Sequence, residues 1–208
     1  QIDTGDLTNS SGNITSNGQV DLEARNIDNT KGAITTQKQL NINAASLSGN
    51  QETIAGGDVV NIAIQGVVDN RQGTIQAGKG LTLTSQSLNS QNGSIINLDT
   101  SDTKITTAQE IENQSGLIGG NGSVNVTGQS LANQGGQVIA KNNLTISAAL
   151  GADNTKGTIS AGQDITLNHS TGNLINASGT ISAGNNLAVQ AVALDNTGGS
   201  MAANKDIN

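Results

Sequence analysis

An aliphatic residue recurs along the whole chain at intervals of 20 to 23 residues, and this period constrains the fold more than any other feature. Taking each of these residues as position 0 divides the chain into ten units, and positions 7, 13 and 15 of most units are aliphatic too. No segment keeps a helical spacing of apolar residues, so the repeat indicates short strands separated by turns. The position-0 residues are Leu7, Ile27, Leu47, Val68, Leu88, Ile111, Leu131, Ala152, Leu174 and Leu194.

Strands this short bury their apolar side only by stacking on neighbouring units. Gln39–Asn43 and Gly80–Thr84 alternate polar and apolar residues, which is the period of a half-buried strand. A unit of about 20 residues matches one coil of a parallel β-helix, whose coils lie about 4.8 Å apart. We therefore expect an all-β fold, a single parallel β-helix (β-solenoid) of about ten coils over residues 1–208. Position 7 should form one buried axial column, which includes Ile14, Ile34, Ile54, Ile75, Ile118, Ile159 and Ile181.

Positions 2 and 5 carry the turn residues of the units. Asparagine occupies position 2 in eight of the ten units, and glycine occupies position 5 in nine. Asparagine tolerates a left-handed backbone, and asparagine amides stacked in successive coils can hydrogen-bond to one another in a ladder. We expect the glycines to supply a positive φ where the chain turns sharply. The asparagines are Asn9, Asn29, Asn70, Asn113, Asn133, Asn154, Asn176 and Asn196.

The composition excludes several classes of protein. The absence of cysteine excludes a disulfide-stapled scaffold, and no apolar run is long enough for a transmembrane helix. A net charge of −7 with scattered lysines and arginines argues against nucleic-acid binding. The chain also has no aromatic residue on which a base or a sugar would stack. The absence of proline fits a fold in which nearly every amide donates to a strand neighbour.

Unit five departs most from the repeat. It holds three extra residues after Ile95, and counting places its positions 13 and 15 on Ser101 and Thr103. We expect Leu98–Lys104 to form a bulged loop that is exposed and available for an interaction. The nearby carboxylates suggest either a cation site or a solvated acidic loop, and the lack of calcium-loop spacing favours the solvated loop. The charged residues of this region are Asp99, Asp102, Lys104, Glu110 and Glu112.

His169 is the only histidine, and it falls at position 17 of unit eight, where several other units have alanine. Because general-base catalysis needs a positioned second group, we expect this side chain to tip outwards at a bulge. His169–Leu174 is thus a second candidate interaction segment. The acidic residues are spread along the chain rather than paired, so we expect no enzyme, no catalytic residue, no metal and no cofactor.

Acidic residues at position 1 occur only in the even-numbered units. Either this spacing is chance among solvated charges, or position 1 forms a stacked column that avoids carboxylates in adjacent coils, since like charges directly opposite repel. A cation follows within three residues in units two, four and eight, as Lys31, Arg71 and Lys156. The acidic residues are Asp28, Asp69, Glu112, Asp153 and Asp195.

Three segments resemble the haemagglutinin repeat of filamentous haemagglutinin and of the exoproteins of contact-dependent growth inhibition. They are Ile27–Ile34, Leu194–Met201 and Gly179–Leu187. The resemblance covers essentially the whole chain. It implies a right-handed β-helical filament that Gram-negative bacteria export by two-partner secretion to the cell surface, and it is specific for architecture rather than for activity.

Two functions remain open for such a filament. The first is a structural stalk that holds a receptor-binding or toxin region away from the bacterial surface. The second is an adhesin whose own β-helix face binds a host receptor or carbohydrate. The resemblance implies as partners other segments of the same exoprotein, an outer-membrane transporter during export, and a target-cell receptor or glycan. We expect neither nucleic-acid binding nor membrane insertion.

The repeat phase also bears on the two ends of the chain. Ile2 falls at position 15 of a coil that begins before residue 1, and Ile207 falls at position 13 of a coil that is unfinished. Open solenoid ends present unpaired strand edges. We therefore expect a fragment of a longer filament that associates end to end when isolated.

Overall fold

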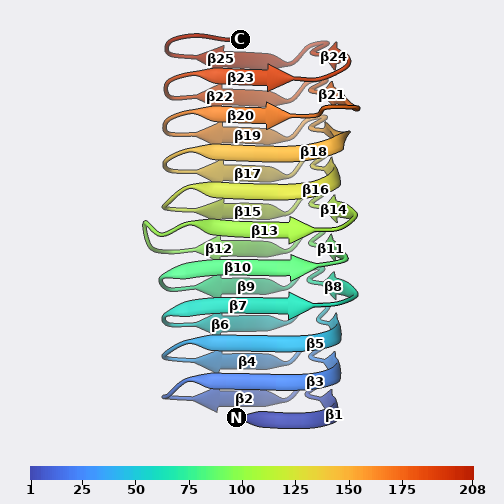
Figure 1. The fold of residues 1–208 in the computed structure, drawn as a ribbon, viewed down its shortest axis with the longest axis vertical. Helices are drawn as coiled ribbons and strands as arrows, with labels where there is room; N and C mark the ends of the chain where they lie inside the picture. The colour runs from blue at the N-terminus through green and yellow to red at the C-terminus, as the bar shows by residue number, and fades with distance from the viewer.

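The computed structural model describes residues 1–208, and it consists of strands and turns without a helix. Figure 1 shows a column of stacked coils in which the front strands run left to right and the back strands run right to left as the chain climbs. This winding is right-handed, and neighbouring strands pair in parallel. The predicted parallel β-solenoid is confirmed. The structure has no helix that would cross a membrane.

The back of the solenoid is one ten-stranded sheet, with one short strand from each coil. Each of its strands has four residues and covers positions 6 to 9 of a unit. Its strands are β2 (Asn13–Ser16), β4 (Ala33–Thr36), β6 (Thr53–Gly56), β9 (Thr74–Ala77), β12 (Ser94–Asn97), β15 (Leu117–Gly120), β17 (Gln137–Ala140), β19 (Thr158–Ala161), β22 (Thr180–Ala183) and β25 (Ser200–Ala203).

The front and one side form a fifteen-stranded sheet that bends around a corner. In some coils a single strand continues around the corner: β1 (Ile2–Thr8), β3 (Val20–Asp28), β5 (Leu40–Ser48), β16 (Val124–Ala132) and β18 (Leu144–Asp153). In the other coils the strand is interrupted there. These pairs are β7 (Val59–Ile64) with β8 (Val67–Asp69), β10 (Gly80–Ser85) with β11 (Ser87–Asn89), β13 (Thr103–Thr107) with β14 (Glu110–Glu112), β20 (Ile165–Asn168) with β21 (Asn173–Ile175), and β23 (Leu187–Gln190) with β24 (Leu194–Asp195).

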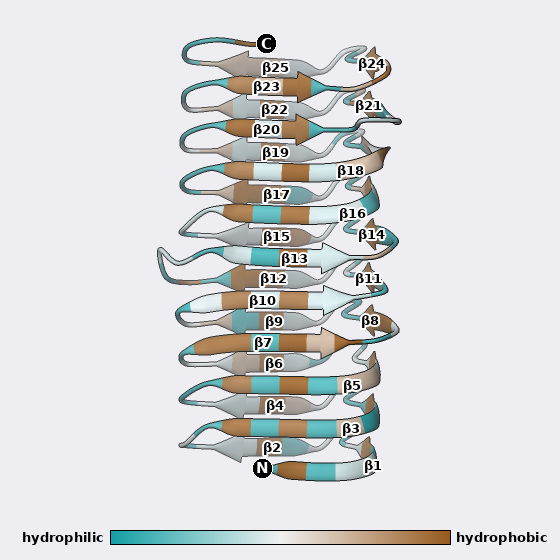
Figure 2. Ribbon diagram, in the orientation of Figure 1, coloured by the Kyte–Doolittle hydropathy of each residue, from teal (hydrophilic) through white to brown (hydrophobic).

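Aliphatic side chains fill the interior in columns that run along the solenoid axis. Position 7 stacks in unbroken register from Ile14 to Met201, and Ile75, Ile118 and Ile159 within it are fully buried. Ile14, in the first coil, is only partly buried. Figure 2 shows the corresponding alternation of apolar and polar residues along the front strands. Forty buried hydrophobic residues form one core, and because all are aliphatic, the coils stack closely.

The residues of coil five that stack in the core differ from those predicted by counting positions along the unit. The residue that stacks between Leu81 and Val124 is Thr103 rather than Ser101, and Ile105 takes the next inward position. Two of the three extra residues are absorbed before β13 begins, which restores an aliphatic residue to the core, and the third lies between β13 and β14. Thr103 is fully buried, and its hydroxyl donates to the carbonyl of Gly119 at 3.3 Å.

The turn after each side strand has a positive φ at position 4, not at the glycine of position 5. Eight of the ten position-4 residues are not glycine, and their φ values lie between 54° and 59°. The prediction that the position-5 glycines supply this φ is wrong. A Cβ at Gly157 would lie 2.3 Å from the Asn133 carbonyl oxygen of the coil below, so glycine is required there for close approach.

The position-2 side chains form the ladder. From Asn113 to Asn196, each amide Nδ2 donates to the Oδ1 of the next coil at 2.7 Å, and Asn9 donates to Asn29 in the same way. All of these side chains are buried except that of Asn196, in the last coil. Asn70 is buried too and donates to Ser90 at 2.9 Å. The ladder is interrupted between Glu52 and Asn70 and between Ser90 and Asn113, and elsewhere its buried hydrogen bonds fix the register of the coils.

Candidate functional site

Two of the three extra residues of coil five lie in an exposed loop between β12 and β13, which protrudes at the left in Figure 1. Asn97 donates its amide to the carbonyl of Ser101 at 2.6 Å and so closes the loop. Asp99 Oδ1 accepts from the backbone of Thr100 at 2.6 Å, and the side chain of Leu98 is 50% exposed. The loop is thus ordered by its own hydrogen bonds and offers one apolar side chain to solvent.

The predicted loop boundary is wrong at its C-terminal end. Lys104 lies within β13 and pairs with Thr82 and Asn125 of the neighbouring strands. Its side chain is exposed on the front face of the solenoid, separate from the loop. Asp102 is exposed at the end of the loop, just before the strand. The structure brings together no group of three or more acidic, histidine or cysteine side chains that would hold a metal ion.

His169 is buried, which contradicts the prediction that it tips outwards. Its Nδ1 donates to the carbonyl oxygen of Ala148 in the coil below at 3.0 Å, while Nε2 has no hydrogen-bond partner. Burial lowers the pKa of the imidazole, although the hydrogen bond to Ala148 partly offsets that effect. The bend follows His169 instead, at residues 170–172. His169 therefore fills space in the position-17 column as a neutral side chain.

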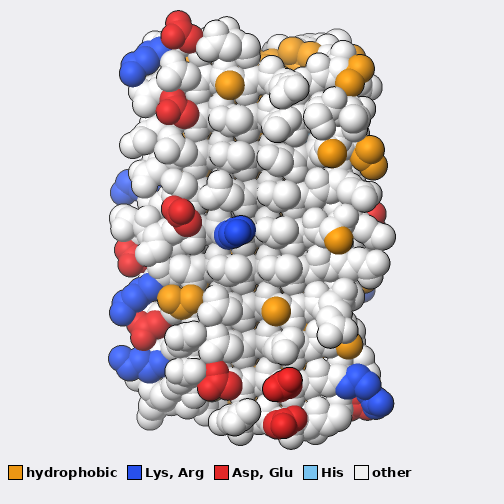
Figure 3. Space-filling view, in the orientation of Figure 1, with side chains coloured by type: hydrophobic (Ala, Val, Ile, Leu, Met, Phe, Trp, Pro, Cys, Tyr) orange, Lys and Arg blue, Asp and Glu red, His pale blue; other side chains and the backbone are white.

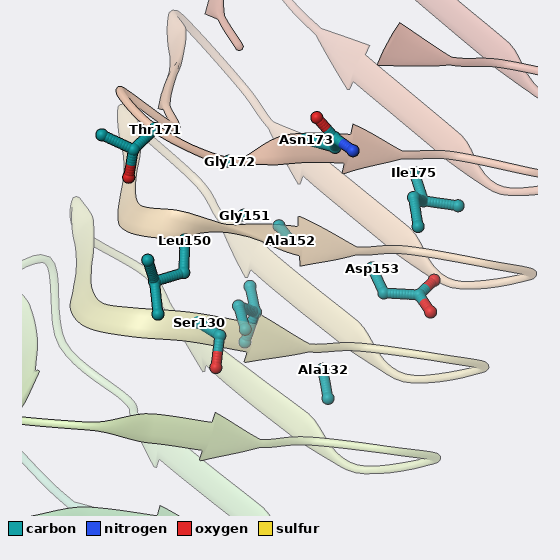
Figure 4. A pocket seen from close by; sticks show the side chains of 11 residues that line it. Ser130, Ala132, Leu150, Gly151, Ala152, Asp153, Thr171, Gly172, Asn173 and Ile175 are labelled. Atoms are coloured by element: carbon teal, nitrogen blue, oxygen red, sulfur yellow. The ribbon is translucent and has the colours of Figure 1, made fainter. Parts of the chain in front are cut away.

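A groove of about 410 Å³ lies at the corner where β16, β18 and β21 meet (Figure 4). The register between β16 and β18 shifts after Gly128, so that β18 carries an extra residue and the Leu150 side chain is 62% exposed. Leu150 lies at one end of the groove, and Asp153 and Ile175 lie at the other. Leu150 is not among the residues predicted from the sequence, where its signal is a leucine beside the one-residue insertion of unit seven.

Two glycines allow the coils to approach closely at this corner. Gly151 has a φ of 118°, and a Cβ there would lie 2.5 Å from the carbonyl oxygen of Asn173. A Cβ at Gly172 would lie 2.0 Å from the carbonyl carbon of Leu150. The segment predicted as a second interaction site, His169–Leu174, thus contributes only its middle residues to the groove. The groove combines the apolar side chains of Leu150 and Ile175 with one carboxylate, Asp153.

The rest of the surface is largely neutral. Figure 3 shows that uncharged groups cover most of the front face, while charged groups lie mainly along its left edge and at the N-terminal coils, and several apolar groups lie towards the C-terminal coils. Position 1 is a stacked column, since Asp28, Ser48 and Asp69 are successive partners. Of the three cations expected beside this column, only Arg71 forms an ion pair, at 2.7 Å from Asp69.

Glu52 is a second residue that was not predicted from the sequence, and its side chain is buried, with 2% exposed. Its carboxyl lies in the amide ladder, where Asn29 Nδ2 donates to Oε2 at 3.3 Å. Burial raises the pKa of this carboxyl well above its usual range. The available signal was the exchange of residue types at positions 2 and 5 of unit three, which carries Gly49 and Glu52 there.

The comparisons with known proteins agree with this architecture. A family model described as the haemagglutinin repeat matches residues 1–72, 63–115, 117–178 and 166–208. No curated protein and no solved structure matches the chain. The family is one of structural and adhesin-like repeats in secreted or cell-surface exoproteins rather than of enzymes. The matched segments cover the chain almost from end to end, and the chain therefore belongs to the haemagglutinin repeat family.

Proposed function

We propose that this chain is a rigid stalk segment of a secreted bacterial exoprotein, which holds a receptor-binding or toxin region away from the cell surface. The observation that carries the proposal is the unbroken stacking of the position-7 column through all ten coils. Each coil contacts only its neighbours, so length is added one coil at a time at about 4.8 Å per coil. The partners would be the flanking segments of the same exoprotein and, during export, an outer-membrane transporter.

The internal bonding favours a passive mechanical role. The chain makes 157 backbone–backbone hydrogen bonds, and its core is one continuous aliphatic cluster. Bending such a rod requires many of these bonds to distort together. A sparsely charged surface without aromatic groups limits adventitious adhesion along the shaft.

Coil duplication in the parent exoprotein tests the stalk. Repeating residues 7–193 in register adds nine coils, about 43 Å of shaft. We expect electron micrographs of the secreted protein to show a filament longer by this amount, with target-cell binding retained. The isolated 208-residue chain should not bind target cells. Saturable binding of the isolated chain to those cells would contradict a purely structural role.

The groove at Leu150 favours a second function, in which the solenoid itself is an adhesin. An exposed leucine beside Ile175 and Asp153 offers apolar contact and a hydrogen-bond acceptor to a receptor or glycan. A glycan array and a cell-binding assay with Leu150→Ser test this function. Val67→Ser is a matched control, because Val67 is also exposed, at 47%, but lies outside the groove. A loss of binding confined to Leu150→Ser would favour the adhesin.

A further inference from the structure

Unit three reverses the residue pattern of every other turn. Position 2 is Gly49 where other units have asparagine or serine, and position 5 is Glu52 where all other units have glycine. A Cβ at Gly49 would lie 1.9 Å from the carboxyl carbon of Glu52. The glutamate therefore reaches across the turn and places its carboxyl group where the ladder side chain of the coil would otherwise begin.

The hydrogen bonds of the ladder all point from the lower coil to the upper coil, so a side chain in it must accept from below and donate above. Where asparagines stack in consecutive coils, the lower amide donates through Nδ2 to the Oδ1 of the amide above. Glu52 accepts from Asn29, as the pattern requires. Asn70 donates through Nδ2 to Ser90 of the coil above. Its Oδ1 therefore faces the coil of Glu52 and needs a donor from that coil.

An ionised carboxylate has no hydrogen to donate. In the structure both Glu52 Oε1 and Asn70 Oδ1 are buried and lack hydrogen-bond partners. Both side chains border the same small space, because a Cβ at Gly73 would lie 2.6 Å from Asn70 Oδ1 and 2.9 Å from Glu52 Cγ. Two unpaired buried acceptors at one junction are costly, and a single proton between them satisfies both.

The surrounding charges do not stabilise an anion at this point. The turn below carries Asp28 and Lys31, and the turn above carries Asp69 and Arg71. Arg71 is paired with Asp69, and Glu52 forms no ion pair. Burial is the main cause of the raised pKa of Glu52, and the charge of Asp69 adds to it.

We propose that Glu52 is protonated in the native solenoid and donates a hydrogen bond to Asn70, which makes the junction of coils three and four a pH-sensitive joint in the amide ladder. With the proton present, the ladder is continuous through this junction. Loss of the proton leaves an anion facing the oxygen of Asn70 and weakens the contact between the two coils. The joint is a property of the fold and holds whether the solenoid is a stalk or an adhesin.

The sign of the pH dependence follows from proton linkage. The unfolded chain releases the Glu52 proton near the usual glutamate pKa, whereas the folded chain retains it to higher pH. The stability from this group is therefore complete below the unfolded pKa and is lost as the pH rises towards the folded pKa. Within that window the unfolding equilibrium constant should increase about tenfold per pH unit.

Direct titration of the full chain is the first test. The sequence contains only four glutamates, Glu23, Glu52, Glu110 and Glu112, so ¹³C-carboxyl labelling of glutamate gives four resonances. We expect the resonance that is absent in Glu52→Gln to titrate at clearly higher pH than a glutamate of the unfolded chain. Titration of that resonance in the usual glutamate range would overturn the proposal.

Stability measurements on Glu52→Gln supply the second test, because glutamine mimics the neutral acid and its Nε2 donates to Asn70. The wild type should lose stability relative to Glu52→Gln as the pH rises above the usual glutamate pKa. His169 and the other acids are present in both proteins, so their titration cancels in the difference. A difference that stays constant with pH would refute the joint.

A double variant keeps the test decisive if Glu52→Gln does not fold. Gly49→Asn with Glu52→Gly restores the common turn pattern and supplies a donor to Asn70, and its stability relative to Glu52→Gln should not change with pH. A further measurement compares the stability of the wild type and of Glu52→Gln at high pH with and without calcium chloride. Stabilisation of the wild type but not of Glu52→Gln by calcium would show that the carboxylate binds a cation, and it would overturn the proposal of a bound proton.

Discussion

Lys156 and Gly157 are adjacent in the same turn, and glycine should have opposite effects on stability at the two positions. Lys156 has a φ of 56°, and its exposed side chain forms no ion pair. Gly157 has an ordinary φ but faces the coil below, where a Cβ would lie 2.3 Å from the Asn133 carbonyl oxygen and 2.5 Å from Asn154 Oδ1. We predict that Lys156→Gly stabilises the chain and that Gly157→Ala destabilises it.

The magnitudes follow from these two constraints. A left-handed conformation costs an L-residue about 1–2 kcal/mol, and glycine avoids this cost. The larger backbone entropy of glycine in the unfolded chain lowers the stability by about 0.5–1 kcal/mol, so only part of the gain remains. Lys156→Gly should therefore raise the free energy of unfolding by about 0.5–1 kcal/mol. At Gly157 the added methyl overpacks a rigid backbone for about 1–3 kcal/mol and disturbs a ladder hydrogen bond worth about 1 kcal/mol.

Thermal unfolding followed by far-ultraviolet circular dichroism measures both effects. For a chain of this size about 1 kcal/mol corresponds to about 2–4 °C in Tm. Lys141→Gly is the matched control, because Lys141 is exposed in a turn without a positive φ, and glycine there should lower the stability. If Lys156→Gly lowers Tm as much as Lys141→Gly does, the positive φ at position 4 does not limit stability.

Three further predictions use the same assay. Ile118→Ala should cost about 2–4 kcal/mol because it opens a cavity in the position-7 column, and a loss below about 0.5 kcal/mol would contradict the burial of Ile118. Ser90→Asn should stabilise by about 1 kcal/mol, since Asn113 Oδ1 above it lacks a donor that a longer amide would supply; an unchanged Tm would refute this account. Ser48→Asp places three carboxylates in successive coils and should lower Tm at low salt, with partial recovery on adding salt.

The sequence alone determined the coil and its columns. A period of 20 to 23 residues with aliphatic residues at fixed positions allows few arrangements other than stacked coils, because each short strand needs the next unit to bury its apolar side. Position 7 could be assigned to the core for the same reason. The asparagine ladder was also predictable, since identical side chains in register face each other at one coil spacing.

The details of the turns depended on the backbone of neighbouring coils. The sequence shows a glycine at position 5, but it does not distinguish a positive φ from a close approach. The close approach at Gly157 appears only when the Asn133 carbonyl of the coil below is placed. The register of unit five was likewise set by packing, because moving Ile105 inwards gained burial that counting residues does not measure.

The candidate sites were the least predictable from sequence. His169 was predicted to be exposed because it interrupts a column of alanines. The structure buries it in that column, and the carbonyl oxygen of Ala148 accepts a hydrogen bond from its Nδ1. The burial of Glu52 depends on the missing side chain at Gly49, because these two residues interact across a turn. Local sequence fixes the repeat because each unit carries the same pattern, whereas the environment of an exceptional residue is set by the coils above and below it, which only the tertiary structure brings into contact.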